Sequence, residues 1–314
     1  MQTNRRQFIA AAGLATAAIG TGCQSVPTRG LTIIDVHPHF YDPTRPKGVP
    51  WPPATDKFLS RPTYPADYRN QEVRRAVTGV VVVEASDRVA DNQWVLDLAA
   101  QDKFIVGLCG NLPLGMPEFA EHLKRFAANE LWTGMRHRQR DLAADLENPD
   151  FMRDAKLLAD NGKQLDMLAR YPLLPLVNRL AKAVPDLRIV IDHFANPRID
   201  GQNVDPEWEA NIREVATNHN VTMKVSGLVE GSGKRDGNAP QDVGFYKPWI
   251  DVVWDSFGPD RLVYGSNWPV SARFASLATV QALVHDYFAD QGTTALRKVF
   301  SENARRVYRW VDRA

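Results

Sequence analysis

The chain has 314 residues, of which 44% are hydrophobic and 24% are charged. A chain of this length and composition can bury a large core, which excludes disordered and fibrous proteins. Its 38 Lys and Arg residues nearly balance its 37 Asp and Glu residues, so its electrostatic field is too weak to attract nucleic acid, and we expect no such partner. Only two cysteines, Cys23 and Cys109, are present, which excludes a disulfide scaffold.

The first 22 residues have the pattern of an export signal. Arg5 and Arg6 precede an uncharged apolar run over residues 8–20, which resembles a twin-arginine signal and is too short to span a bilayer. Residues 20–23 resemble a lipoprotein box, in which Cys23 would carry the lipid; ordinary cleavage nearby is the alternative. We therefore expect an exported, periplasmic protein, with a membrane anchor at Cys23 as one of two outcomes.

From residue 31 onward, short β-branched runs alternate with amphipathic stretches, which is typical of a parallel α/β sheet. The pattern predicts eight strands, at residues 31–37, 79–85, 104–108, 132–138, 163–168, 188–193, 221–225 and 261–265. It predicts helices at residues 92–101, 117–129, 149–161, 174–184, 206–219, 245–257 and 276–290, followed by two terminal helices at 293–300 and 301–311. Eight such repeats without a glycine-rich phosphate loop favour a single-domain (β/α)₈ TIM barrel over residues 31–311.

Two long connections follow predicted strands. Residues 41–65 contain seven prolines and four aromatic residues, so we expect an ordered lid there. Residues 230–243 are rich in glycine and charge; they could close over a substrate or form a solvated loop. In a barrel of this type the active site lies where the strands end, so both connections border the expected site.

Three histidines occur where predicted strands end. His37 and His39 alternate with other residues at the end of the first strand, and Asp35 lies on the same face one layer lower, where it could orient the imidazoles. His193 follows an apolar strand, whereas histidines within the predicted helices are expected at the surface. Two or three histidines at one barrel mouth indicate a metal site or an acid/base site.

Charged residues within apolar strands are further candidates. Lys224 lies in the seventh strand, where an ammonium group needs either a carboxylate partner or a substrate anion. Glu84 ends the second strand and is a candidate partner or base. Arg136 could face inward, with His137 turned toward a helix.

Five motifs appear in one order along the chain: Asp35-Val36-His37-Pro38-His39, Asp192-His193-Phe194, Lys224-Val225-Ser226-Gly227, Gly265-Ser266-Asn267-Trp268-Pro269 and Asn303-Ala304 followed by Tyr308. Together they resemble the amidohydrolase superfamily. More narrowly, the chain resembles the branch that includes 2-pyrone-4,6-dicarboxylate lactonase, L-fuconolactonase and 4-sulfomuconolactone hydrolase. The resemblance implies the barrel fold and a site built from His37, His39 and His193.

The chain departs from the family pattern at Asn267, where the family has an aspartate that takes a proton from the attacking water. A neutral carboxamide cannot act as a general base. Three accounts are open. One divalent metal, zinc or manganese, held by His37, His39 and His193 could activate the water; Glu84 or a histidine could serve as base without metal; or the chain could bind without turnover.

The reaction that the resemblance implies is hydrolysis of an ester-like carbonyl, and we expect a lactone that bears a carboxylate. Arg136 and Lys224 are candidate clamps for the substrate carboxylate, with an ion pair to Glu84 as the alternative for Arg136. Trp268 is a further candidate for substrate contact. A decarboxylase of the same superfamily and a periplasmic binding protein without chemistry are the competing functions. We expect a small-molecule partner and a homo-oligomer.

Overall fold

The computed structural model describes residues 30–138 and 141–313 of the chain. The predicted signal segment and the candidate lipidation site at Cys23 lie outside these described residues, so their prediction is untested. In the part of the chain that the structure describes, no helix is long and apolar enough to cross a membrane.

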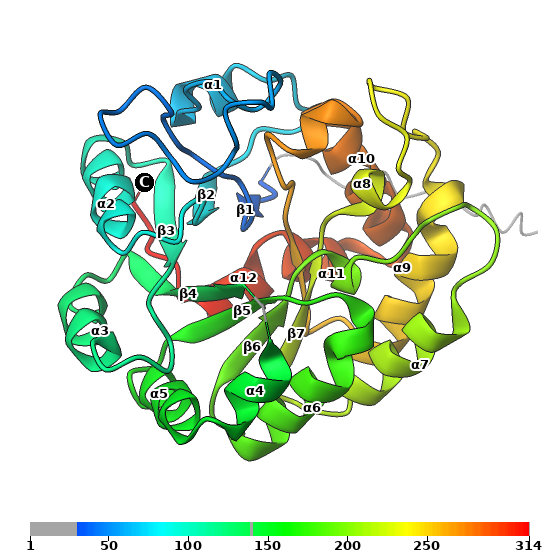
Figure 1. Cartoon of the computed structure of the whole chain (residues 1–314). Helices are drawn as coiled ribbons and strands as arrows, with labels where there is room; N and C mark the ends of the chain where they lie inside the picture. The colour runs from blue at the N-terminus through cyan, green and yellow to red at the C-terminus, as the bar shows by residue number, and fades with distance from the viewer. Residues whose placement is uncertain (1–29, 139–140, 314) are drawn as a thin grey trace, which may run out of the picture.

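Eight parallel strands form one sheet in the described chain, and each strand pairs with the next in sequence. The strands are β1 (Ile34–Asp35), β2 (Gly79–Val83), β3 (Ile105–Gly110), β4 (Trp132–Arg138), β5 (Gln164–Leu168), β6 (Arg188–Ile191), β7 (Val221–Val225) and β8 (Leu262–Tyr264). The sheet curls until β1 and β8 meet, and there Val36 N–H donates to the carbonyl of Tyr264 over 3.1 Å. This nearly closed barrel confirms the predicted fold (Figure 1).

Twelve α-helices accompany the strands in the described residues. They are α1 (Pro65–Arg69), α2 (Ala90–Gln101), α3 (Phe119–Ala127), α4 (Leu142–Glu147), α5 (Pro149–Asp160), α6 (Leu174–Ala183), α7 (Pro206–Val215), α8 (Leu228–Gly231), α9 (Val243–Phe257), α10 (Leu277–Asp290), α11 (Thr293–Arg297) and α12 (Asn303–Tyr308). The short helices α1, α4 and α8 were not predicted, because each is a brief turn with too few residues for a periodic pattern. A π-helical turn, Lys298–Glu302, joins α11 to α12 where two helices were predicted.

Local sequence explains the elements. The valine run of β2 is fully buried on both faces, as parallel strands between the barrel interior and outer helices require. In α3, Phe119, Leu123 and Phe126 are buried, so they form one apolar stripe at helical spacing. Asp205 begins α7, because its carboxylate accepts hydrogen bonds from two backbone N–H groups of the first turn.

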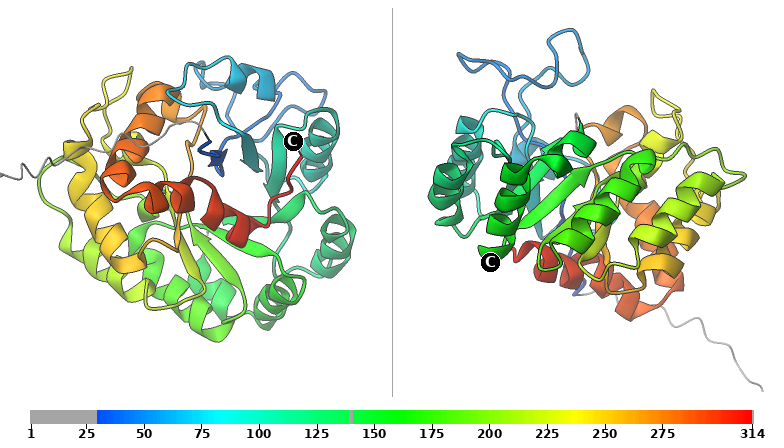
Figure 2. Two further views of the ribbon diagram at one scale, coloured as in Figure 1. Left: turned by 180° about the vertical axis from the view of Figure 1, so that it is seen from behind. Right: turned by 60° about the horizontal axis from the view of Figure 1, so that its bottom comes forward.

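The two ends of the barrel differ. The right view in Figure 2 shows the connection after β1 rising at one end, while α11 and α12 lie at the opposite end. This connection is ordered by a short antiparallel bridge between Tyr41 and Thr63, and by a hydrogen bond from the Tyr41 hydroxyl to the carbonyl of Leu59. The long loop therefore has a defined conformation at the end of the barrel where the strands terminate.

Candidate active site

Three imidazoles meet at the strand ends. His37 and His39 follow β1, and His193 follows β6. The ring of His37 lies 4.3 Å from that of His193 and 5.0 Å from that of His39, between centroids. All three side chains are buried. The structure thus brings together the three histidines that the motifs singled out.

The chain reaches this arrangement through unusual backbone conformations. His193, Phe194, Ala195 and Asn196 all have positive φ angles between 52° and 57°, a left-handed turn that costs roughly 1–2 kcal/mol per residue without glycine. The indole N–H of Trp208 supports this turn by donating to the carbonyl of Phe194 over 2.7 Å. Strained backbone that persists in a fold is typical of functional sites.

Two glycines permit the close approach of the site segments. A Cβ on Gly265 would lie 2.8 Å from the Cβ of His37 and 3.2 Å from Cδ of Lys224. A Cβ on Gly227, whose φ is +73°, would lie 2.6 Å from the Cβ of His193. Only glycine therefore lets the ends of β7 and β8 pack against the histidines.

Each imidazole has a partner at its Nδ1 atom. His39 Nδ1 donates to the carbonyl of Val83 over 2.9 Å, and His193 Nδ1 shares a hydrogen bond of 2.8 Å with the hydroxyl of Ser226. The ammonium of Lys224 donates to His37 Nδ1 over 3.0 Å. Partners at Nδ1 leave Nε2 of His39 and His193 available for a ligand, as in histidines that bind metals, whereas His37 Nε2 lies 3.5 Å from Arg136 Nη1.

The histidines are neutral near pH 7. Burial lowers the pKa of His193 to about 4, and burial together with the charge of Lys224 lowers the pKa of His37 well below its ordinary value. Burial and the charge of Arg136 lower the pKa of His39 in the same way. Neutral imidazoles accept protons and bind metal ions, so these residues suit either role.

Asp35 does not orient the imidazoles, contrary to the sequence-based expectation. Its Oδ1 accepts backbone hydrogen bonds from His37 over 3.0 Å and from Ser266 over 2.8 Å, and its Oδ2 accepts from the hydroxyl of Tyr68 over 2.7 Å. Asp35 therefore joins β1 to the end of β8 through the backbone, and burial raises the pKa of its carboxyl.

Lys224 has carboxylate partners, one of its two predicted alternatives. Its ammonium lies 2.7 Å from Asp166 Oδ2 and 2.8 Å from Asp192 Oδ1, and all three side chains are 0% exposed. Tyr308 donates to the same oxygen of Asp166 over 2.8 Å. Burial alone would raise the pKa of Asp192, but the charge of Lys224 and the interaction with His37 lower it well below its ordinary value. In this arrangement Lys224 has no free face for a substrate carboxylate.

Arg136 forms the predicted ion pair with Glu84, at 2.8 Å between Nε and Oε1. The guanidinium of Arg138 binds both carboxylate oxygens of Glu84, at 2.7 and 2.6 Å. Glu84 is thus held by two cations and poorly suited to take a proton from water. The Nη1 atom of Arg136 lies 3.5 Å from His37 Nε2, so Arg136 still borders the histidines. His137 turns away and contacts Asp145 of α4 at 2.8 Å.

Asn267 follows β8 and has a φ of 56°, in the left-handed region that asparagine tolerates. Its amide donates to Glu230 of α8 over 2.8 Å. Trp268, a candidate for substrate contact, is 2% exposed and packs edge-on against Tyr68 and Phe40. It therefore lies in the apolar core and offers almost no surface to a substrate.

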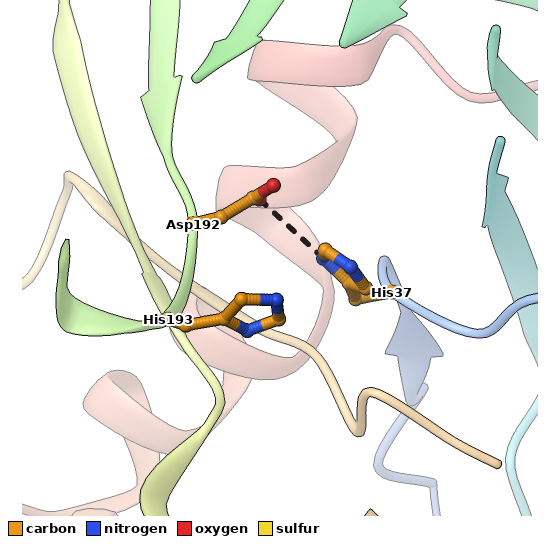
Figure 3. A group of neighbouring side chains, drawn as sticks. All are labelled: His37, Asp192 and His193. Atoms are coloured by element: carbon orange, nitrogen blue, oxygen red, sulfur yellow. Dashed lines mark ion pairs between the residues drawn. The ribbon is translucent and has the colours of Figure 1, made fainter. Parts of the chain in front are cut away.

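One compact group could hold a metal ion. Ligand atoms of His37, Asp192 and His193 all lie within 4.8 Å of one another. Figure 3 shows the three side chains pointing toward one another, with Asp192 and His37 joined as an ion pair of 3.4 Å. Asp192 stands in this group in place of the predicted His39. Both oxygens of Asp192 are buried and accept no hydrogen bond of good geometry from the described residues. Oδ1 forms the ion pair with Lys224, and Oδ2 is the oxygen without such a close cation, which suits a ligand for a metal ion.

Five residues around the site were not among the sequence candidates: Arg138, Asp166, Asp192, Glu230 and Tyr308. Asp192 and Tyr308 occur in the motifs. Asp166 is a charged residue inside a predicted strand, and the same kind of position made Lys224 a candidate. Arg138 is two residues from Arg136 and so shares its face of β4. Glu230 had only a weaker signal, its place in the connection after strand seven.

Comparison with known proteins agrees with this geometry. The family model described as Amidohydrolase matches residues 34–310. An L-fucono-1,5-lactonase from Burkholderia ambifaria is 30% identical over 286 residues, covering 89% of this chain and 96% of that protein. An L-rhamnono-gamma-lactonase from Scheffersomyces stipitis is 27% identical over 224 residues, covering 62% of this chain and 64% of that protein.

Among solved structures, an amidohydrolase from Burkholderia multivorans with bound zinc superimposes with a TM-score of 0.80 at 27% identity. The superposition covers 89% of this chain and 99% of that one. The family model spans nearly the whole barrel, from β1 to the residues after α12. This chain therefore belongs to the amidohydrolase family.

Proposed function

We propose that this chain is a lactone hydrolase. The observation that carries the proposal is the meeting of neutral His37, His39 and His193 at the strand ends of a barrel whose relatives at 27–30% identity are named as lactonases. Those names favour a sugar-derived lactone as substrate, and a lactone bearing a carboxylate is the second class to test. The named lactonases favour this function over the competing decarboxylase and binding-protein hypotheses.

The reaction needs a base for the water, hydrogen-bond donors for the oxyanion and a proton for the ring oxygen that leaves. A water oxygen bonds to the lactone carbonyl carbon while the water loses a proton to a base, and the carbonyl electrons move to oxygen. The resulting oxyanion needs donors, and the guanidinium of Arg136 beside His37 is one such group. The bond from carbon to the ring oxygen then breaks, and that oxygen takes a proton, which leaves a hydroxy acid.

We further propose that His37, Asp192 and His193 hold one divalent metal ion. Two neutral imidazoles and a carboxylate are a donor set that zinc accepts, and the zinc-bound structure at 27% identity supports this assignment. When bound, such an ion would polarise a carbonyl and lower the pKa of water. The chain itself keeps His193 in place through Ser226, and keeps Asp192 ionised through Lys224.

A lactonase screen with metal analysis tests both proposals. Purified mature protein is assayed by pH-indicator titration against sugar lactones and dicarboxylate lactones, and its metal content is measured by mass spectrometry. We expect saturable ring opening and about one zinc or manganese ion per chain, both lost in His37→Ala. The matched control is His219→Ala, because His219 is exposed. Full activity after rigorous chelation would contradict the metal, and no lactone opened above background would contradict the function.

We also propose that residues 1–22 direct export to the periplasm and that Cys23 is the lipidation site. Support comes from Arg5 and Arg6 ahead of the apolar run at residues 8–20. A reporter fused behind residues 1–30 should reach the periplasm only when both arginines are present, and Cys23→Ala should release it from the membrane fraction. Export that survives Arg5→Lys with Arg6→Lys would contradict the twin-arginine assignment. A homo-oligomer remains our expectation, to be measured by light scattering.

A further inference from the structure

A hydrogen bond links the end of β8 to the turn after β7. Asn267 Nδ2 donates to Glu230 Oε1 over 2.8 Å. An amide donates only through its nitrogen and a carboxylate only accepts, so this bond fixes which end of the Asn267 amide faces Glu230. Glu230 belongs to α8, which directly follows Ser226 and Gly227, the two residues packed against His193. The pair therefore joins the residues after β8 to the segment that begins with the neighbours of His193.

The carboxylate of Glu230 is buried and has only one oxygen that is hydrogen-bonded within the part of the chain that the structure describes. Its Oε2 atom is buried and has no hydrogen-bond partner among the described residues. The ionisable side chain that faces it from the packed helix α9 is Tyr246, whose hydroxyl donates to the carbonyl of Pro240. No cation forms an ion pair with Glu230 in the described chain. Burial raises the pKa of Glu230 to about 7, which suits a group that exchanges protons near neutral pH.

The other carboxylates around the histidines have partners that hold them. Glu84 is bound by Arg136 and Arg138. Lys224 pairs with both Asp166 and Asp192, and Asp35 accepts three hydrogen bonds from β1, the end of β8 and a tyrosine. Asp166 Oδ1 and both oxygens of Asp192 also lack a hydrogen-bond partner among the described residues, but Lys224 holds these two carboxylates in ion pairs. Glu230 has a free oxygen, Oε2, and no cation partner in the described chain, so it is the carboxylate best suited to accept a proton.

We propose that Glu230 is the general base of this site, in the place of the strand-eight aspartate that this chain lacks, and that Asn267 is its positioning residue. The inference rests on the proposed lactone hydrolysis. The negative charge that an aspartate would bring at position 267 is supplied by Glu230 from the neighbouring strand end. The asparagine is then a matched partner of Glu230, because an aspartate there would place two carboxylates 2.8 Å apart.

Glu230 first accepts and then returns one proton in the proposed hydrolysis. Glu230 takes one proton from water while the water oxygen bonds to the lactone carbonyl carbon, and the carbonyl electrons move to oxygen. When the tetrahedral oxyanion collapses, the bond to the ring oxygen breaks. The protonated Glu230 returns its proton to that oxygen, which becomes the hydroxyl of the product, and the new carboxylic acid ionises to solvent.

Glu230→Gln tests the base, because it keeps the size and the acceptor oxygen of the side chain and removes the proton site. We expect kcat to fall by about 100-fold or more, the range for loss of a general base, and the acid limb of the kcat/KM profile near pH 7 to disappear. The control is Glu72→Gln at an exposed position, with kcat and pH profile unchanged. A kcat for Glu230→Gln within about threefold of wild type with the same limb would overturn the proposal.

A charge swap separates catalysis from packing. Asn267→Asp alone should lower activity at neutral pH, because adjacent carboxylates share one proton. The double variant, Asn267→Asp with Glu230→Gln, restores one carboxylate and one carboxamide in exchanged positions. We expect the double variant to recover at least about tenfold in kcat over Glu230→Gln, since a base is again present. Equal kcat values for Glu230→Gln and for the double variant would show that Glu230 has only a structural role.

A second measurement judges the pair without turnover. In metal-free wild-type protein labelled with ¹³C at the glutamate carboxyl carbon, one resonance should titrate near pH 7, and that resonance should be absent from Glu230→Gln. If no glutamate titrates above its ordinary range, the inference fails even when lactones are hydrolysed. If the wild type hydrolyses no lactone while this resonance is present, the proposed function is wrong, but the raised pKa of Glu230 is confirmed.

Discussion

Removal of the Lys224 ammonium is the sharpest test of the buried ionic cluster. In Lys224→Met the apolar stem is kept and the charge is lost. Asp166 and Asp192 then have no cation at 2.7 and 2.8 Å, and both are 0% exposed. Loss of one partner from a buried pair costs about 3–5 kcal/mol, because a charge is left uncompensated. We expect a loss in this range or above it, because two carboxylates are affected.

Urea unfolding of metal-free protein at pH 7 measures the effect. Lys247→Met is the matched control: its ammonium lies 2.7 Å from Asp251, but the two side chains are 56% and 39% exposed. The two lysines therefore have the same distance to a carboxylate, 2.7 Å, and differ in burial. An exposed pair contributes less than about 1 kcal/mol, so Lys247→Met should have little effect on stability. Adding Asp166→Asn to Lys224→Met should restore part of the lost stability, because one orphaned charge is removed.

The effect of pH on Lys224→Met has a definite sign. In the wild type the pKa of Asp192 is lowered, so its stabilising contribution is present above the ordinary carboxyl pKa and is lost as pH falls through the lower folded value. Without Lys224, burial raises the pKa of Asp192 and its carboxyl becomes protonated as pH falls. The gap in stability between wild type and variant should therefore narrow toward pH 4. An equal loss for Lys224→Met and Lys247→Met would refute the reasoning.

Three further outcomes follow from the site. Asp35→Ala should lower the free energy of unfolding by at least about 3 kcal/mol in urea titrations, since three buried donors lose their acceptor; a loss below 1 kcal/mol would contradict this. Gly265→Ala should lower kcat at least tenfold with an unchanged circular dichroism spectrum, because its Cβ would lie 2.8 Å from that of His37; wild-type kcat would argue against close packing. Metal-free protein should lose stability as pH falls from 7 to 5. The pKa of His193 is about 4 and those of His37 and His39 are also lowered, so the unfolded chain binds more protons than the folded chain in this pH range. The free energy of unfolding should fall by up to about 1.4 kcal/mol per histidine and pH unit, and a urea midpoint independent of pH would exclude buried neutral imidazoles.

Much of the fold was predictable because it depends on local patterns. The buried valines of β2 and the stripe of Phe119, Leu123 and Phe126 in α3 have periods that differ between strand and helix. His37 and His193 were predictable site residues because polar groups that follow apolar strands converge in a parallel barrel. The exact strand limits were not, since β1 pairs regularly only over Ile34–Asp35.

Contacts between distant strands could not be predicted. The pairing of Lys224 with Asp166 joins β7 to β5 across the barrel interior, and sequence alone does not give the stagger that brings them level. Asp35 was expected to hold an imidazole, but it binds backbone N–H groups that the bend after β1 presents. His285 was expected at the surface, yet it is buried on the inner side of α10.

Glu230 shows a different limit. Its proximity to Asn267 depends on the left-handed Gly227 and the single turn of α8 that follows it. A four-residue turn has no periodic pattern, so the sequence indicated a loop from residue 230 onward and gave no direction to this side chain. The missing aspartate was visible in the sequence, whereas the carboxylate that replaces it required the fold.

Catalysed lactone opening by this site is the central claim, and one comparison tests it most directly. Initial rates of sugar-lactone hydrolysis are measured by pH-stat for the wild type and for His37→Ala, with both proteins folded by circular dichroism. The account predicts saturable hydrolysis by the wild type and a fall of about 100-fold or more in kcat/KM for the variant. Wild-type rates at the uncatalysed background, or equal rates for the two proteins, would contradict it.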